Sequence, residues 1–534
     1  GHGLSVGDIV QLDSVTLPSG TGFSASDFED KNFQVITVPT TSTFTITQSS
    51  NAGATVSTGG SLSIKPYEPV GPRAQSYGYG WGIAGWGNGN FGEAASASDV
   101  TLEPGLWSLD NFGQVLVATI LNGKTFTWNA GASTPLETRA STTTSGFATG
   151  SNPTATRVSL ISPTTRHLIH LGTETTIGDT TTQDDMFIRF SDQEDINTYT
   201  PSAINTAGTL RLQDGTKIIG SLKAKEVILV WTDNALYTMK FIGAPFTFQL
   251  EQVGTNCGLI GQNAVVEIDG AAFWLSSKGF FLYDGTVKSI PCTVEDFVYD
   301  NFDTTKGQQV AAGLNNLFTE ITWYYPSSGS DYNDKYVVFN YGESAGVAGG
   351  VWYTGTEART SWIDSNVYPT PFATKYDSTA DGTFPVIVGQ DGLGQTTYFE
   401  HEIGTDQINP NGTTTTVTSF IESFDIDLQG RAKDAKGRST GPKIAGEVFL
   451  AMRRFVPDFK TLQGNAKVSL DVKRYPQQTS TQTALSPFTI TSSTDKKDTR
   501  ARGRFVSVKI ENDSSSESWR FGTLRLDVQA DGRR

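Results

Sequence analysis

The chain has 534 residues, 56 of them Gly, with 11% aromatic residues, 18% charged residues and a formal net charge of −15. This length exceeds what one hydrophobic core supports, so we expect about two to four domains. The composition favours pleated sheet with many turns, and predicts an all-β protein. No apolar stretch approaches the ~20 residues of a membrane helix, and the sequence shows no secretion signal, so we expect a soluble chain without membrane insertion.

Charge is unevenly distributed along the chain. Residues 431–534 contain 21 Lys+Arg against 11 Asp+Glu, a net of +10, and the remainder contains 19 against 44, a net of −25. An acidic body argues against a surface that grips DNA, because neutralising phosphates needs Lys and Arg. The basic end favours docking on an acidic neighbour.

The N-terminal region reads as a separate module. The sequence opens at Gly1 without an initiator Met, so we expect that an N-terminal part of the protein is missing. Residues 1–70 hold short apolar segments separated by Gly, Pro and Asn, which predict a small β-barrel or sandwich module of the kind inserted into larger chains.

Residues 71–104 form a Gly/aromatic loop segment. Its glycines alternate with five rings, which are Tyr77, Tyr79, Trp81, Trp86 and Phe91. Gly80, Gly82 and Gly85 match a dinucleotide-binding spacing, but WGNGNFG cannot continue as the helix that such a site needs, so we expect no nucleotide or other cofactor. We interpret the rings as anchors that hold the loop on a neighbouring surface.

From residue 105 to 400 the chain repeats paired short strands without repeating a sequence. Turn signals such as Asn122-Gly123, Asp233-Asn234 and Asp269-Gly270 join β-branched segments and predict two-residue hairpins. The units recur every 40–55 residues or so, about the length of a four-stranded propeller blade. A β-propeller is the most economical architecture for this region.

One helix is expected within this region, over residues 293–303. Val294, Phe297, Val298 and Phe302 would share its apolar face, and Thr293 would cap its N-terminus.

Residues 401–534 predict a separate C-terminal domain. The stretch 401–419 loses the apolar alternation and reads as a boundary. Five or so later segments, among them VFLAMRRFVPDF and GRFVSVKIEN, alternate cleanly between apolar and polar residues. This pattern predicts a C-terminal antiparallel β-sandwich.

Candidate chemical groups give weak signals. Cys257 and Cys292 are too few and too far apart for a disulfide framework and are expected to be reduced. His167 and His170 have the spacing of metal ligands but would point to opposite faces of a strand, so no metal site is expected. His401 lies between Glu400 and Glu402 and is interpreted as a surface hydrogen-bonding group.

Paired carboxylates leave an enzyme alternative open. Propellers host glycosidases, and a glycosidase needs two carboxylates about 5–10 Å apart. The chain has many Asp and Glu residues, including Asp184, Asp185, Asp192, Glu194 and Asp195. Asp-rich turns explain this group better, and we expect no catalytic residues.

Several segments resemble the nozzle protein of short-tailed bacteriophages, the tail tubular protein B and packaged-DNA stabilisation protein family. They include DMFIRFSDQEDINTYTP (185–201), GLIGQNAVVEIDGAAFWLSSKGFFLYDG (258–285), VWYTGTEARTSWID (351–364) and WRFGTLRLDVQADGRR (519–534). The matching segments are spread over residues 76–534 and are specific in combination, although each is weak alone.

The resemblance implies a structural virion protein located in the tail and assembled in the host cytoplasm. Its members form a homohexamer below the tail adaptor, near the tail fibre or spike proteins, with a channel that first retains and then conducts double-stranded genomic DNA. The resemblance implies no catalysis. The alternatives are a propeller glycosidase or depolymerase of a phage tail, and a carbohydrate-binding adhesin.

Basic and aromatic residues of the C-terminal region are the strongest interaction signal. We predict contacts with other subunits or the adaptor at Arg453, Arg454, Arg500, Arg502, Arg504, Trp519 and Arg520. The arginines could also bind DNA, but the interspersed acidic residues favour a protein partner.

Overall fold

The computed structural model describes residues 4, 9–29, 31–56, 60–67, 74–75, 103–131, 140, 147, 150–225, 227–330, 332–347, 349–365, 367–377, 395–408, 413–428, 430–433, 439–444, 448–475, 477–478, 482–483, 487–512 and 514–532. The chain divides into two compact units, Gly1–His401 and Glu402–Arg534.

Both units are built almost wholly from antiparallel strands, so the all-β prediction is confirmed. Helical residues in the described ranges are confined to α1 (Glu295–Tyr299) and three 3-10 turns, which are η1 (Ala25–Asp27), η4 (Thr180–Thr182) and η5 (Thr304–Gln309). Among the described residues, no helix has the length and apolar character needed to cross a bilayer.

The first unit opens with a small β module. One sheet has the order β2-β1-β5, and a hairpin joins β3 to β4. Their bounds are β1 (Ile9–Thr16), β2 (Asn32–Gln34), β3 (Thr37–Thr40), β4 (Thr43–Thr45) and β5 (Ser61–Tyr67). Val10 and Leu12 are buried on one face of β1, against Phe33 of β2, because alternate residues of a strand face the same side. A further pair joins β6 (Ala74–Gln75) to β7 (Glu103–Pro104).

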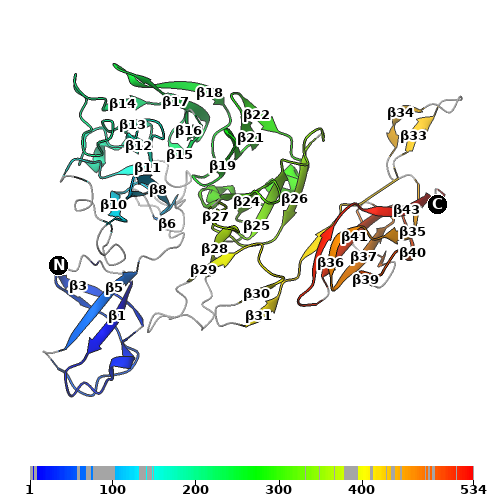
Figure 1. Ribbon diagram of the computed structural model, residues 1–534, viewed down its shortest axis with the longest axis horizontal. Helices are drawn as coiled ribbons and strands as arrows, with labels where there is room; N and C mark the ends of the chain where they lie inside the picture. The colour runs from blue at the N-terminus through cyan, green and yellow to red at the C-terminus, as the bar shows by residue number, and fades with distance from the viewer. Residues whose placement is uncertain are drawn as a thin grey trace, which may run out of the picture. The chain divides into compact units, whose positions relative to one another are not determined.

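Six antiparallel sheets then follow one another along the chain, as the predicted β-propeller requires (Figure 1). The first three contain β8 (Trp107–Phe112), β9 (Val115–Ile120) and β10 (Thr125–Asn129), then β11 (Thr156–Ile161), β12 (Leu168–Thr173), β13 (Phe187–Phe190) and β14 (Gly208–Arg211), then β15 (Ile218–Lys223), β16 (Ile228–Thr232), β17 (Ala235–Gly243) and β18 (Thr247–Thr255). The next three contain β19 (Val265–Ile268), β20 (Ala271–Ser276), β21 (Gly279–Tyr283) and β22 (Val287–Ile290), then β23 (Ala311–Asn315), β24 (Glu320–Tyr325), β25 (Lys335–Asn340) and β26 (Val351–Gly355), then β27 (Ser361–Ile363), β28 (Phe372–Asp377) and β29 (Gln395–Glu400).

Each four-stranded sheet is a simple meander, and consecutive sheets meet through their first strands. β11 contacts β15, β15 contacts β19, β19 contacts β23, and β23 contacts β27. Sheets arranged radially around their first strands are the blades of a β-propeller. The fold class predicted for this region is therefore confirmed.

Fully buried tryptophans recur at matching positions in three blades. Trp231 in β16, Trp274 in β20 and Trp323 in β24 each lie in the second strand of their sheet and have no exposed surface. The indole Nε1 of Trp323 donates to the carbonyl of Ala264, which precedes β19, at 3.1 Å. Trp362 of β27 likewise donates to Leu314 of β23 at 2.9 Å. These two bonds link the fifth and the sixth blade, each to the one before it.

Two of the three predicted tight turns are confirmed. Asp233-Asn234 and Asp269-Gly270 are the only residues between their flanking strands. Asp269 and Gly270 both have positive φ, at 51° and 88°, as the preferred hairpin turns require. The turn at Asn122-Gly123 was predicted too short, because four residues separate β9 from β10, and Asn122 alone adopts a positive φ of 55° there.

The predicted helix is present but shorter than expected. α1 begins at Glu295, and Val294 rather than Thr293 occupies the N-cap position, without a side-chain cap. Val294, Val298 and Phe302 are buried as predicted. Phe297 is 52% exposed, so its assignment to the buried face was wrong. Five residues make little more than one turn, so the helix has room for a single buried stripe.

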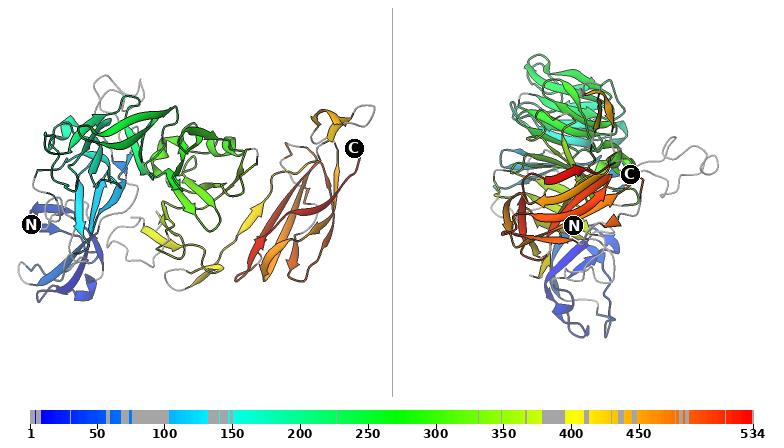
Figure 2. Two further views of the ribbon diagram at one scale, coloured as in Figure 1. Left: turned by 45° about the horizontal axis from the view of Figure 1, so that its top comes forward. Right: turned by 90° about the vertical axis from the view of Figure 1, so that its right-hand side faces the viewer.

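The second unit contains the predicted C-terminal sandwich (Figure 2). One sheet has the order β32-β41-β37-β38, with β39 also paired to β37, and further strands form β40-β35-β43 and β36-β42. Its strands are β32 (Phe420–Glu422), β35 (Leu450–Val456), β36 (Phe459–Gln463), β37 (Asn465–Lys473), β38 (Gln482–Thr483), β39 (Phe488–Thr491), β40 (Lys497–Gly503), β41 (Phe505–Asn512), β42 (Ser518–Phe521) and β43 (Arg525–Ala530), with separate pairs β30 (Asp406–Ile408)–β31 (Thr414–Thr416) and β33 (Gly430–Lys433)–β34 (Ser439–Ile444).

The sandwich core follows the alternation seen in the sequence. Every second residue of β37 is buried, from Ala466 to Val472. These side chains pack with Val506 and Val508 of β41 and with Met452 and Phe455 of β35, on the opposing sheet. The period of two therefore places one face of each strand in the core and leaves the other for solvent or partners.

Candidate functional site

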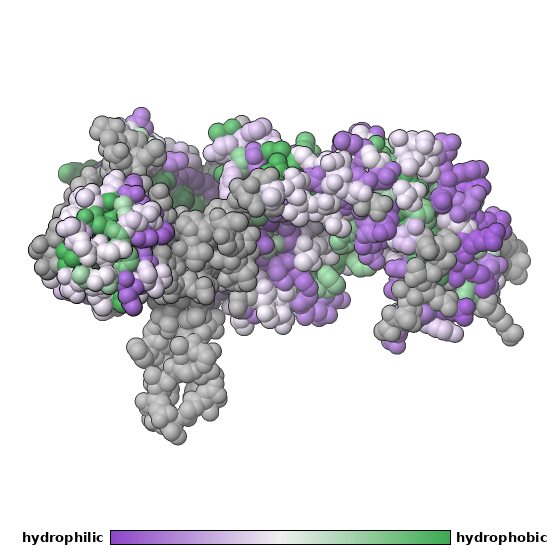
Figure 3. All heavy atoms as spheres, turned by 90° about the horizontal axis from the view of Figure 1, so that it is seen from below, coloured by the Kyte–Doolittle hydropathy of each residue, from purple (hydrophilic) through white to green (hydrophobic). Residues whose placement is uncertain are grey.

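Most of the basic residues predicted to make contacts gather on one sheet of the C-terminal sandwich. Arg453 lies on β35, and Arg500 and Arg502 lie on the neighbouring edge strand β40. All three side chains are exposed. The alternation of β40 buries Thr499 and Ala501 and turns the intervening arginines outward. Figure 3 shows hydrophilic residues gathered over this unit, at the right of the view.

Strand pairing places Arg453 beside Arg500. Met452 pairs with Ala501 and Arg454 pairs with Asp498, so Arg453 lies opposite the residues between those partners, where the register shifts. No ion pair joins Arg453 or Arg500 to any residue that the structure describes. Like charges on facing strand positions destabilise a sheet, so this pair raises the positive potential at a cost in stability.

The remaining arginines of this face are held by neighbours. Arg454 forms an ion pair with Asp498 at 2.9 Å, and Arg502 pairs with Asp531. The guanidinium groups of Arg502 and Arg504 lie over the ring of Phe449, at 4.7 and 5.2 Å from its centroid. Ring stacking of this kind fixes the orientation of a guanidinium.

Two of the predicted contact residues lie elsewhere in the unit. Arg520 is exposed on β42, and its neighbour Trp519 is half-buried against the core, with its ring centroid 6.4 Å from that of Phe459. The structure thus brings together Arg453, Arg454, Arg500, Arg502 and Arg504 and separates them from this pair. The predicted loop anchors Tyr77, Tyr79, Trp81, Trp86 and Phe91 lie outside the described residues.

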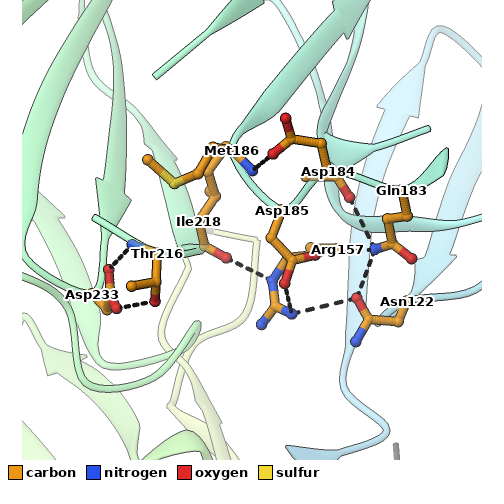
Figure 4. Close-up of polar contacts among 10 residues, drawn as sticks. Asn122, Arg157, Gln183, Asp184, Asp185, Met186, Thr216, Ile218 and Asp233 are labelled. Carbon is orange, nitrogen blue, oxygen red and sulfur yellow. Dashed lines mark hydrogen bonds and ion pairs between the residues drawn. The ribbon is translucent and has the colours of Figure 1, made fainter. Parts of the chain in front are cut away.

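A buried polar junction joins the first three blades (Figure 4). Arg157 of β11 is 3% exposed, and its Nε donates to the carbonyl of Ile218 in β15 at 2.8 Å. Its Nη1 lies 3.5 Å from the carboxylate of Asp185 and 3.4 Å from Oδ1 of Asn122. Gln183 donates to the same Asn122 oxygen at 2.9 Å. The residues come from three neighbouring blades, and their hydrogen bonds hold these blades together.

Carboxylates of the body are engaged in turns. Asp192 accepts hydrogen bonds from the backbone N–H groups of Gln193 and Thr206, and Asp195 accepts from Asn197. Arg211 pairs with Asp184 at 2.7 Å. Burial raises the pKa of that carboxyl, but hydrogen bonds from Arg211 and from the Met186 backbone, with the charge of Arg211, outweigh burial and hold the pKa below its usual range. Every resolved Asp or Glu shift among the described residues is downward. A glycosidase acid needs the opposite shift.

His167 and His170 are buried and neutral. Burial, reinforced by the charge of Arg189, lowers the pKa of His170 to about 3, and its Nε2 bonds the Tyr199 hydroxyl at 3.0 Å. Burial lowers the pKa of His167 to about 4. The ring of His167 packs on Phe190 and Phe248, away from Tyr199, and the described residues contain no cluster of three metal-ligating groups.

The interpretation of His401 as a surface group was wrong. Its ring packs 4.6 Å from that of Trp362, and its Nε2 accepts a hydrogen bond from Nε of Arg359 at 2.8 Å. Burial, followed by the charge of Arg359, lowers the pKa of His401 to about 4. No local pattern predicts this pair, because 42 residues separate its members.

The thiols show no sign of activation. Cys257 and Cys292 are both free, and burial raises the pKa of each, that of Cys292 to about 12. A reactive cysteine needs a lowered pKa, so neither is suited to nucleophilic chemistry.

An exposed apolar hairpin tip was not predicted from the sequence. β17 and β18 are nine residues each, and their tip exposes Ile242 by 47% and Phe246 by 73%. A groove of about 470 Å³ beside it is lined by Leu210, Leu212, Tyr237, Phe248 and Leu250, among others. The uninterrupted run Phe-Ile-Gly-Ala-Pro-Phe, without a charge, was the available signal.

No protein-family model matches the chain, and no curated protein matches it. Among solved structures, Hsv2 of Kluyvelomyces marxianus is 10% identical over 50% of this chain and 68% of its own, with a TM-score of 0.26. BamB of Moraxella catarrhalis is 14% identical over 53% and 82%, with a TM-score of 0.27. A glycoside hydrolase is 10% identical over 79% and 96%, with a TM-score of 0.23. Likenesses this low carry no functional inference.

Proposed function

We propose that the chain is a structural subunit of a bacteriophage tail nozzle. Six copies form a ring below the tail adaptor, and the central channel retains and then conducts the genomic DNA. The proposal rests on the resemblance of segments spread over residues 76–534, and is supported by an all-β chain that joins a propeller to a basic sandwich.

The observation that carries the proposal is the opposite charge of the two units. Residues 1–401 contain 19 Lys+Arg and 39 Asp+Glu, a net of −20, whereas residues 402–534 contain 21 and 16, a net of +5. Double-stranded DNA carries about one negative charge per ~1.7 Å, so a basic wall binds and slows it. In our proposal an acidic wall repels the DNA and lets it pass.

Within this proposal the basic sandwich makes protein contacts, and the chain has no catalytic role. Its partners are other copies of itself, the adaptor, and the tail fibre or spike proteins. The DNA passes through the channel without binding stably, and the protein is located in the virion tail. A channel lined mainly by Lys and Arg would contradict the charge argument.

Electron-microscope class averages of the purified assembly test the proposal. We expect a six-fold ring with an axial channel. The competing function is a phage-tail glycosidase, depolymerase or carbohydrate-binding adhesin with a propeller fold. A spot assay for polysaccharide clearing separates the enzyme from the nozzle, because a nozzle clears nothing. Clearing by a monomeric or trimeric chain would replace our proposal with the enzyme.

A further inference from the structure

We propose that the outer face of β35 and β40 is the surface through which one copy of the chain docks on the acidic first unit of a second copy. The face is defined by Arg453 of β35, by Arg500 and Arg502 of β40, and by Arg504, which directly follows β40. This inference rests on the proposed function, which requires copies to meet, and goes further by assigning the surface and the chemistry of its partner.

The first argument is that two arginines of this face keep their positive charge without an internal ion pair. Arg453 and Arg500 lie at neighbouring positions of adjacent strands, both exposed, and neither pairs with a described carboxylate. The hydroxyl of Thr499 bonds the carbonyl of Met452 at 2.7 Å, which fixes the edge strand so that Arg500 points outward. Juxtaposed like charges cost stability, and an incoming carboxylate removes that cost.

The second argument is that the neighbouring arginines are already oriented. The guanidinium groups of Arg502 and Arg504 both lie over the ring of Phe449, which is only 8% exposed. Guanidinium groups held in place lose less side-chain entropy when they bind a carboxylate. The face is thus preorganised for anionic side chains.

The third argument identifies the occupant by charge complementarity. The first unit carries a net charge of −20, so a second copy supplies a strongly acidic partner at the same concentration. DNA is disfavoured because Asp498 and Asp531 lie among the arginines and would repel phosphates. Mixed charges of this kind suit a protein surface.

Charge reversal of the full chain tests the docking face. The variant R453E/R500E reverses the two unpaired arginines. The matched control K460E/K496E reverses two exposed lysines of the same unit that belong neither to the docking face nor to the predicted contact residues, with the same change in net charge. R453Q/R500Q removes the charge without reversing it. Thermal unfolding of each variant checks that it folds like the wild type.

The readout is self-association by sedimentation velocity at low and high salt. We expect wild-type association that weakens as salt screens the charges, a loss of about tenfold or more in R453E/R500E, a smaller loss in R453Q/R500Q, and a change within about twofold in K460E/K496E. Equal losses in R453E/R500E and K460E/K496E, or a wild-type chain that stays monomeric at low salt, would overturn the inference.

The two proposals fail in different ways. A wild-type hexamer that R453E/R500E leaves intact would overturn the docking face while the nozzle function stands. Arginine-dependent association into a dimer or trimer would support the docking face and contradict the nozzle. DNA binding lost in R453E/R500E, without any self-association, would assign the face to nucleic acid and overturn the inference.

Discussion

Nε of Arg157 donates to the carbonyl oxygen of Ile218 at 2.8 Å and so joins β11 to β15, the first strands of two consecutive blades. The guanidinium is buried and also reaches Asn122 and Asp185. One side chain therefore bridges three sheets at the point where the blades converge.

Replacing Arg157 by Met should destabilise the propeller. The variant removes hydrogen bonds from buried acceptors, and we expect the free energy of unfolding to fall by about 2–4 kcal/mol in urea titrations. Arg211→Met is the control, because its ion pair with Asp184 is half-exposed and should be worth under ~1 kcal/mol. Equal losses in the two variants would contradict the conclusion that Arg157 stabilises the contact between the blades.

Gly172→Ala tests the packing beside Arg157. Gly172 has a φ of 65°, and an added Cβ would lie 2.7 Å from Cγ of Arg157. Gly178 shares the positive φ, at 87°, but a Cβ there meets nothing within 4 Å. Both substitutions cost about 1–2 kcal/mol in backbone strain, and we expect Gly172→Ala to cost ~1–3 kcal/mol more in chemical denaturation. A Gly178→Ala variant that is equally unstable would exclude the clash.

Stability should fall on mild acidification. The pKa values of His167, His170 and His401 are lowered to about 4, 3 and 4, below the ordinary value of 6.5. Between pH 6.5 and about 4 the unfolded chain therefore binds more protons than the folded chain. The histidine contribution is complete above pH 6.5 and declines as pH falls, by at most ~1.4 kcal/mol per pH unit for each histidine.

Urea titrations at pH 7.5, 6 and 5 measure this slope. His401→Gln should reduce the slope of the free energy of unfolding against pH by up to the contribution of one histidine, because Gln accepts the Arg359 hydrogen bond without titrating. An unchanged slope would show that His401 is not held neutral by its site.

Much of the fold follows from local patterns in the sequence. The period-two alternation of β37 and the Asp269-Gly270 turn are each set by residues close together in the chain, so their prediction succeeded. The buried tryptophans Trp231, Trp274 and Trp323, spaced 43 and 49 residues apart, would have located three blades directly.

What could not be predicted depends on distant contacts. The Arg157 junction joins residues up to 61 positions apart, and the His401–Arg359 bond spans 42. The exposure of Phe297 depends on the helix being a single turn, which residue spacing alone did not reveal. The arginines of the candidate docking face were found from composition, but their cross-strand register required the structure.

The mass of the native assembly tests the nozzle proposal most directly. Native mass spectrometry of the purified chain should give about 345 kDa, six times the 57.5 kDa of one chain, as a closed ring requires. A stable monomer or trimer under the same conditions, with no ring in class averages, would contradict the nozzle and favour the glycosidase or adhesin.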